Sequence, residues 1–76
     1  MITPAQCRGA RGLLKWNQKE LAAKSGISSL AINRFERGRS SPHHATLKVL
    51  KETFEEAGVA FIDRDEGVGV LLKKSD

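Results

Sequence analysis

The sequence predicts a mainly helical domain in which four short helices are followed by a C-terminal β-hairpin. Two observations carry this prediction. Over most of the chain, apolar residues recur at helical spacing between residues that typically start and stop helices. After Gly58 the spacing changes, and two short apolar runs flank a charged, glycine-containing turn.

The length limits how such a fold can be stabilised. A chain of 76 residues makes one small domain, which buries only about 60% of its unfolded surface. Its one cysteine, Cys7, excludes an intramolecular disulfide, and adjacent His43 and His44 make a poor zinc site. We therefore expect no metal or cofactor, and we expect compact helix packing together with self-association.

The first helix is expected at about residues 4–14. Thr3 is a good helix cap, Pro4 suits the first helical position, and Gln6 completes a capping box. Cys7 follows on the apolar stripe, which favours a buried thiol over a reactive one.

A pair of short helices follows, at about 18–25 and 29–37. The first begins at the cap signature Asn17-Gln18-Lys19-Glu20 and ends at Gly26, a natural left-handed helix stop. Ser28 caps the second helix three residues later. Two short helices joined by a turn that contains glycine form a helix-turn-helix.

A fourth helix is expected at about 43–57, and the hairpin strands at 59–63 and 68–73 with the turn between them. This divides the chain into a helical domain, residues 1–58, and a hairpin segment, residues 59–76.

Charge is distributed unevenly along the chain. Residues 1–51 contain ten Lys and Arg against two acids, a net +8, whereas residues 52–76 contain three against seven, a net −4. A basic front indicates a polyanionic partner such as double-stranded DNA. We find no grouping of nucleophile, base and orienting residue and no phosphate-binding glycine loop, so the sequence does not predict an enzyme.

The helix pair resembles the helix-turn-helix of phage repressor/Cro-like (XRE family) transcriptional regulators. The matching residues are Arg11, Leu13-Leu14, Trp16-Asn17-Gln18, Glu20-Leu21-Ala22, Gly26-Ile27-Ser28, Ile32, Phe35-Glu36-Arg37-Gly38 and Pro42. The resemblance covers roughly residues 4–57. It implies a regulator, expected to be a repressor or autoregulator, whose recognition helix at 29–37 enters the major groove of a palindromic operator.

The resemblance also implies roles for individual residues. The expected base-reading residues are Ser29, Leu30, Asn33 and Arg34. The expected phosphate contacts are Asn17, Gln18, Ser28, Arg37, Arg39 and His43. Arg11 and Glu36 match a partly buried ion pair of the family.

The hairpin lies outside the resemblance, and a lone two-stranded hairpin is marginal in water. Its apolar residues must therefore be covered, either by the first and fourth helices of the same chain or by a second copy. We expect a homodimer whose contact residues are Val59, Phe61, Val68, Val70 and Leu72.

Two other functions remain open at this stage. The chain could be the antitoxin of a toxin–antitoxin pair, or a protein-interaction adaptor built on the same fold. The possible partners are therefore DNA, a second copy, and a toxin or other regulator protein. No apolar run reaches the about 20 residues of a membrane span, so we expect a cytoplasmic protein, nucleoid-associated when bound to DNA.

Overall fold

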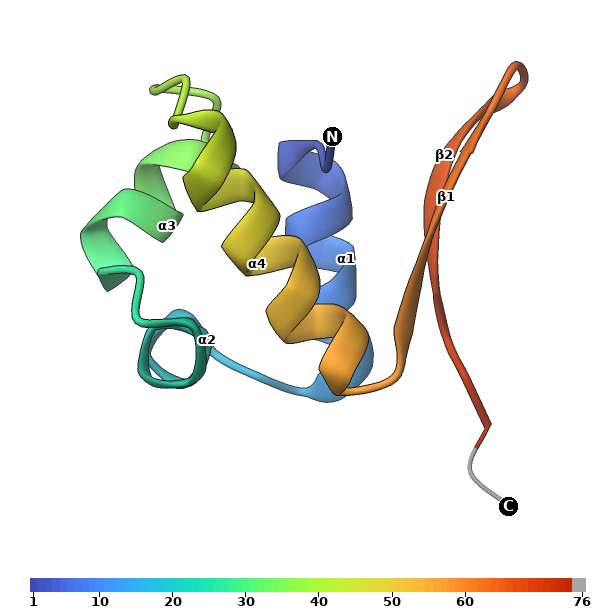
Figure 1. Ribbon diagram of the computed structural model, residues 1–76, viewed down its shortest axis with the longest axis horizontal. Helices are drawn as coiled ribbons and strands as arrows, with labels where there is room; N and C mark the ends of the chain where they lie inside the picture. Colours follow the sequence, from blue (N-terminus) through green and yellow to red (C-terminus); the bar gives the residue numbers. More distant parts are fainter. Residues whose placement is uncertain (75–76) are drawn as a thin grey trace.

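The computed structural model describes residues 1–74, which form four helices followed by a two-stranded antiparallel sheet (Figure 1). The helices are α1 (Pro4–Leu14), α2 (Gln18–Ser25), α3 (Ser29–Glu36) and α4 (His44–Glu56). The strands are β1 (Val59–Arg64) and β2 (Gly67–Leu72). The predicted mainly helical fold with a C-terminal hairpin is confirmed. The end of the expected hairpin segment, residues 75–76, lies outside the described residues.

Local capping explains why the predicted starts of the first three helices are accurate. The Thr3 hydroxyl accepts from the Gln6 backbone N–H at 3.1 Å, and the Gln6 side chain accepts from the Thr3 N–H at 2.9 Å. Asn17 and Glu20 form the same reciprocal pair at the start of α2. These bonds satisfy N–H groups that have no partner inside the helix.

The ends of several elements differ slightly from the predictions. Arg37 is the C-cap of α3 and His43 precedes α4, so both helices are shorter than expected. The strands continue to Arg64 and resume at Gly67, which leaves a two-residue turn in place of the four residues, 64–67, expected. Gly67 has a φ of 151°, a conformation that favours glycine and closes this tight turn.

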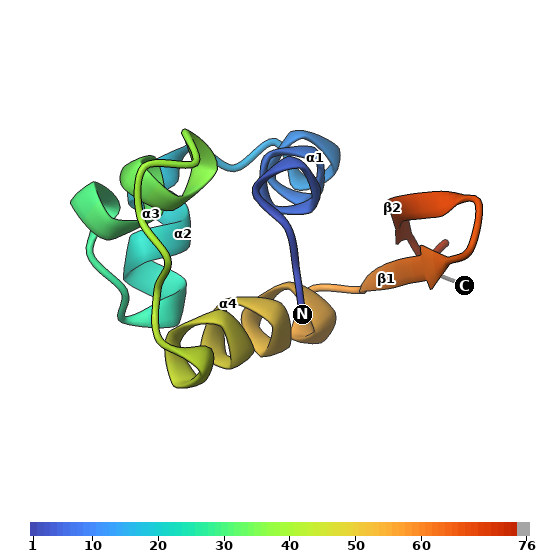
Figure 2. The same ribbon diagram turned by 90° about the horizontal axis from the view of Figure 1, so that it is seen from above.

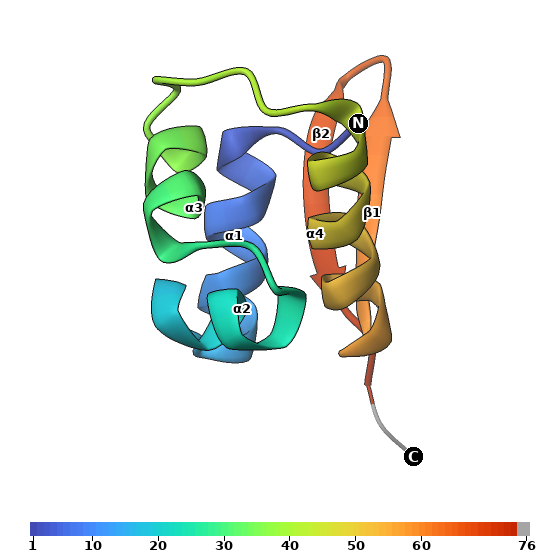
Figure 3. The same ribbon diagram turned by 60° about the vertical axis from the view of Figure 1, so that its left-hand side comes forward.

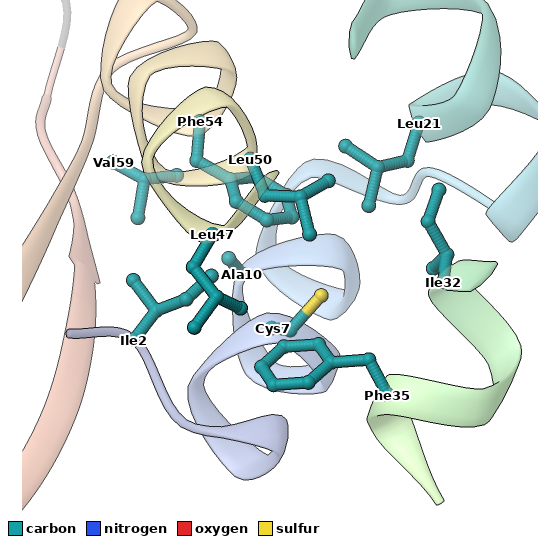
Figure 4. Packing of buried hydrophobic residues seen from close by; sticks show 10 residues of the cluster. All are labelled: Ile2, Cys7, Ala10, Leu21, Ile32, Phe35, Leu47, Leu50, Phe54 and Val59. Carbon is teal, nitrogen blue, oxygen red and sulfur yellow. The ribbon is translucent and has the colours of Figure 1, made fainter. Parts of the chain in front are cut away.

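The hydrophobic core lies where the four helices meet, and Figure 4 shows its side chains converging from all of them. Leu21, Ile32 and Phe54 are completely buried. Trp16 stacks on Phe54 with ring centroids 5.9 Å apart. The ring of Phe61, on β1, also packs against Phe54, with centroids 6.0 Å apart. The hairpin is thereby joined to the helical core through an aromatic cluster.

The hairpin packs one face against α1 and α4 on the side of the molecule opposite α3 (Figures 1 and 2). Alternate residues of a strand point to opposite faces, and Val59, Phe61 and Val70 all belong to the face turned toward the helices. We call this the inner face of the hairpin. Gly9 of α1 lets it approach closely, because a Cβ on Gly9 would lie 3.1 Å from Val70 Cγ2.

This packing corrects part of the expected dimer contact. Val59 is 1% exposed in its own chain, so its assignment to an interface with a second copy is wrong. Phe61 and Val70 pack against the same core. Val68 and Leu72, at the two ends of the inner face, keep 50% and 37% of their surface exposed. The helices of the same chain therefore cover the middle of this face.

Candidate nucleic-acid interface

The turn between α2 and α3 fixes the angle at which α3 leaves the core. Gly26 has a φ of 77°, which a residue with a side chain adopts only with strain. The Ser25 hydroxyl accepts from the Ile27 N–H, and the Ser28 hydroxyl accepts from the Ala31 N–H, both at 3.1 Å. These bonds hold the turn and start α3 at a defined position. Figure 3 shows α2 and α3 joined by this turn.

One side of α3 is anchored in the protein. Ile32 is fully buried, Phe35 is 5% exposed and Glu36 is 4% exposed. Spacings of three and four residues put these side chains on one side of the helix, facing α1 and α2. The other side is left to solvent.

The buried carboxylate of Glu36 is the centre of a polar network that joins three helices. Arg11 donates to it from Nε at 2.7 Å and from Nη2 at 2.6 Å, so the ion pair implied by the family resemblance is present. Cys7 Sγ donates at 3.1 Å and Gln18 Nε2 at 3.1 Å. Arg8 also donates to the backbone carbonyl of Glu36 at the end of α3. The carboxylate thus fixes α3 relative to α1 and α2.

This network shifts the pKa values of its members. Burial by itself would raise the pKa of Glu36, but hydrogen bonds from Arg11, Cys7 and Gln18 outweigh it and hold that pKa below its usual value. The bond to Glu36 raises the pKa of Arg11. Burial and the neighbouring carboxylate raise the pKa of the Cys7 thiol, which therefore stays protonated and inert.

Two of the expected DNA-contacting residues are linked to this network. Asn33 Nδ2 donates to Gln18 Oε1 at 3.3 Å, while Gln18 itself donates to Glu36. Asn33 is half-buried, so it is less open to a base than its neighbours on α3. Gln18 keeps a second amide hydrogen, which leaves it one donor for an outside acceptor.

The exposed side of α3 carries the other expected base-reading residues. Ser29, Leu30 and Arg34 are exposed, and Leu30 keeps 60% of its surface accessible. We call Ser29, Leu30, Asn33 and Arg34 the α3 surface. An apolar side chain, two small polar groups and a guanidinium on one helical side are suited to contacts with base edges.

Most of the expected phosphate-contacting residues border the α3 surface and are exposed. Ser28 precedes α3, and Arg37 and Arg39 follow it. The Arg39 N–H donates to the Arg34 carbonyl at 2.8 Å, which turns the chain back at the end of α3 and keeps the two arginines beside it. His43 makes no capping hydrogen bond with its side chain.

Asn17 differs from the other expected phosphate contacts because its side chain already caps α2 through a bond to the Glu20 N–H at 2.7 Å. Sequence reasoning missed the bonds from Gln18 and Asn33, because an amide at a helix surface carries no signal of its partner. Residues 1–74 contain no group of three or more histidines, cysteines and acids close enough to hold a metal ion. None of the helices they form has the length and apolar character needed to cross a membrane.

Comparison with known proteins supports this geometry. A search of curated proteins finds no match. The family model for the helix-turn-helix domain matches residues 8–56, which span α2, the turn, α3 and α4 together with most of α1. The matched segment contains the Gly26 turn, the buried side of α3 and its exposed basic side. The chain therefore belongs to the XRE (Cro/C1-type) family of helix-turn-helix DNA-binding regulators.

Proposed function

We propose that this protein is a sequence-specific repressor that also regulates its own gene, and that it binds a palindromic operator as a homodimer in the cytoplasm. The observation that carries the proposal is that α3 has one buried side and one exposed side. Ile32, Phe35 and Glu36 hold the buried side in the protein, while Leu30 and Arg34 are exposed. A rigidly held helix with an exposed polar and basic side is suited to the major groove.

Each residue of the α3 surface has a chemically distinct role in this proposal. Arg34 donates to guanine O6 and N7, and Leu30 contacts a thymine methyl group. Ser29 donates to or accepts from a base edge. Asn33 uses one amide hydrogen for its bond to Gln18, and its second amide hydrogen and its carbonyl oxygen are the donor and acceptor that adenine N7 and N6 require.

The phosphate contacts surround this surface. Arg37 and Arg39 supply charge at the end of α3, Ser28 supplies a hydroxyl at its start, and His43 lies beyond the loop. Gln18 and Asn17 supply amide donors at the start of α2. Such contacts orient the protein without reading sequence, and each neutralised phosphate adds to the salt dependence of binding.

The proposed operator is palindromic because a single recognition helix contacts too little DNA. One short recognition helix reaches only a few base pairs, which is too little for specific binding on its own. A two-fold dimer places two such helices on half-sites about 34 Å apart, one DNA turn, or a multiple of it.

The first experiment selects binding sites from a pool of random DNA duplexes, followed by footprinting of the tagged protein in its host. We expect an inverted repeat in the selected sequences and a sharp peak upstream of the protein's own gene. A reporter under that upstream region should be switched off when the protein is supplied. Selected sequences with no shared motif would contradict the proposal, and co-purification of a second protein would then favour an antitoxin or an adaptor.

Two arginine variants separate base reading from phosphate contact. Arg34→Ala should weaken operator binding by about 1–3 kcal/mol and relax the preference at one base pair of each half-site. Arg37→Ala should weaken binding to all duplexes alike. It should reduce the slope of log affinity against log salt concentration by about one, the value for one lost phosphate contact. Lys48→Ala, which removes one positive charge from the exposed side of α4, is the matched control. If Arg34→Ala lowered the affinity for all sequences equally, Arg34 would not be a base-reading residue.

A further inference from the structure

Among residues 1–74, strand β2 has more exposed large hydrophobic side chains than any other helix or strand. Seven large hydrophobic side chains of the described chain are exposed, and three of them, Val68, Leu71 and Leu72, belong to this six-residue strand. The strand Gly67–Leu72 contains no charged or polar side chain. Natural proteins protect free strands with charge or proline, or cover them. Val68 and Leu72 lie at the two ends of the inner face, and Leu71 lies on the opposite face, which the helices do not cover.

The uncovered side of the sheet is the face opposite the helices, which we call the outer face. The strand register assigns Ala60, Ile62, Gly69 and Leu71 to it, with Arg64 and Gly67 at the turn end, since they alternate with the inner-face residues. Figure 2 shows the helices on the other side of the sheet. Leu71 keeps 53% of its surface exposed there. This face therefore lies open to an incoming surface.

The outer face has a diagonal pattern of large and small residues. Leu71 is paired with Ala60 across the two strands, and Gly69 is paired with Ile62. A Cβ built on Gly69 would meet no atom within 4 Å, so the space that a side chain would fill is open at that position. Each hairpin thus presents a projecting Leu71 and an open hollow at Gly69. A surface that carries both can pack against a copy of itself, as a two-fold contact requires.

The ends of the hairpin carry opposite net charges, because Asp63, Asp65 and Glu66 outnumber Arg64 at the turn end. Asp65 and Glu66 form the turn, and Lys73 and Lys74 follow the far end of β2; all four are exposed. The Lys73 N–H donates to the Gly58 carbonyl at 2.9 Å, which fixes the chain at the basic end. Two hairpins packed in opposite directions bring each acidic turn to the lysines of the other copy. The charge pattern therefore favours a second copy over a foreign partner.

We propose that the homodimer forms by packing the outer faces of two hairpins in opposite directions, with Leu71 of each copy over Gly69 of the other. This proposal rests on the homodimer of the proposed function and names its surface. It moves the contact from the inner face, which the helices of the same chain cover, to Ala60, Ile62, Gly69 and Leu71.

The first test is Leu71→Glu, measured by sedimentation equilibrium of the full chain against Val49→Glu. Val49 is an exposed apolar residue of α4, with 37% of its surface accessible. Leu71 occurs twice in a two-fold dimer, so Leu71→Glu should weaken dimerisation at least about a hundredfold. Val49→Glu should leave it unchanged. A monomeric wild-type protein, or a Leu71→Glu variant that dimerises like it, overturns the proposal.

A second test uses the hollow at Gly69. Gly69→Leu adds apolar surface and would strengthen non-specific association, but it fills the space that Leu71 of the other copy needs. We expect weaker dimerisation for Gly69→Leu and partial recovery in the double variant Gly69→Leu/Leu71→Ala. Stronger dimerisation of Gly69→Leu would rule out the packing of Leu71 over Gly69.

A third test checks the opposite directions of the two hairpins. Asp65→Lys/Glu66→Lys and Lys73→Glu/Lys74→Glu should each weaken the dimer by about three- to tenfold at low salt, because exposed ion pairs contribute little individually. The quadruple variant exchanges the two ends and should recover wild-type dimerisation. Lack of recovery would contradict the head-to-tail arrangement.

DNA binding separates failure of this inference from failure of the proposed function. If Leu71→Glu is a monomer that has lost binding to the selected inverted repeat but keeps weak binding to any duplex, both stand. If the variant remains a dimer that binds the repeat, only the surface named here is wrong. If the wild-type protein dimerises through Leu71 but selects no motif, only the proposed function fails.

Discussion

The helix-turn-helix and the hairpin are attached to the same core by different kinds of contact. The α3 helix is fixed by a buried carboxylate, Glu36, that accepts hydrogen bonds from Arg11, Cys7 and Gln18. The hairpin is fixed mainly by apolar packing and by one buried amide, Gln6, which donates to the carbonyls of Ile62 at 3.1 Å and Gly69 at 2.9 Å. Directional bonds set the orientation of the helix that faces DNA, whereas the hairpin needs mainly to be covered.

The largest loss of stability is expected when the Glu36 carboxylate is removed. Glu36→Ala leaves the Arg11 guanidinium without its partner and the donors of Cys7 and Gln18 unsatisfied. We expect the free energy of unfolding to fall by about 3 kcal/mol, as measured by urea denaturation, because removing one partner of a buried pair strands the other. Glu52→Ala, which removes an exposed carboxylate of α4, should change it by less than about 0.5 kcal/mol. A Glu36→Ala variant as stable as Glu52→Ala would refute this role.

The same carboxylate predicts how stability depends on pH. The folded protein holds the pKa of Glu36 below its usual value near 4.5. A lowered pKa adds stability that is present above the usual value and is lost as pH falls through the folded pKa. Urea denaturation from neutral pH downward should therefore show a loss beginning near pH 4.5 and continuing below it. Glu36→Gln should reduce this slope, and an unchanged slope would place the acid sensitivity on other carboxylates.

The hairpin attachment is tested by exchanging an amide for a carboxylate. Gln6→Glu keeps the acceptor that caps α1 but loses the donor to Ile62 and Gly69, so a carboxylate then faces two carbonyls. We expect a loss of about 1–3 kcal/mol in the free energy of unfolding. Amide hydrogen exchange should become faster in residues 59–72 and stay nearly unchanged in α3.

Glu20→Gln is the matched control, because it makes the opposite exchange in the exposed capping box of α2. It should change stability by only a few tenths of a kcal/mol. Equal acceleration of exchange in α3 and in the hairpin for Gln6→Glu would mean that the two regions unfold as one unit.

The sequence predicted best what depends on local chemistry. The helix starts follow from the caps at Thr3, Asn17 and Ser28, whose bonding partners lie within three residues. The Arg11–Glu36 pair followed from the resemblance to repressors. The second role of Gln6 could not be predicted, because its partners Ile62 and Gly69 lie far away in the sequence and are backbone carbonyls.

The orientation of the hairpin was also beyond sequence reasoning. Both faces carry apolar residues, Phe61 and Val70 on one and Ile62 and Leu71 on the other. Alternation therefore separates the residues into two sets but does not say which set the helices cover. The small residue that lets the inner face approach α1 closely, Gly9, would be interpreted from the sequence only as a weak helix former.

The smallest expected effect is a difference in stability between two glycine variants of α1, which tests how closely the hairpin packs on that helix. Gly12 has open space at its Cβ position, so Gly12→Ala should raise the free energy of unfolding by about 0.5–1 kcal/mol through helix propensity alone. Gly9→Ala gains the same propensity, but its Cβ would lie 3.1 Å from Val70 Cγ2. We therefore expect a smaller gain at Gly9, measured by urea denaturation of both variants.

Shortening Val70 isolates the contact. In a Val70→Ala background the crowding at Gly9 disappears, so Gly9→Ala and Gly12→Ala should there be equally stabilising, although Val70→Ala itself costs packing. If the two glycine variants already gain equally in the wild-type background, the hairpin moves away from α1 without measurable cost. The inner face would then be held by Gln6 and the aromatic cluster of Phe54 and Phe61, and close packing on α1 would contribute little.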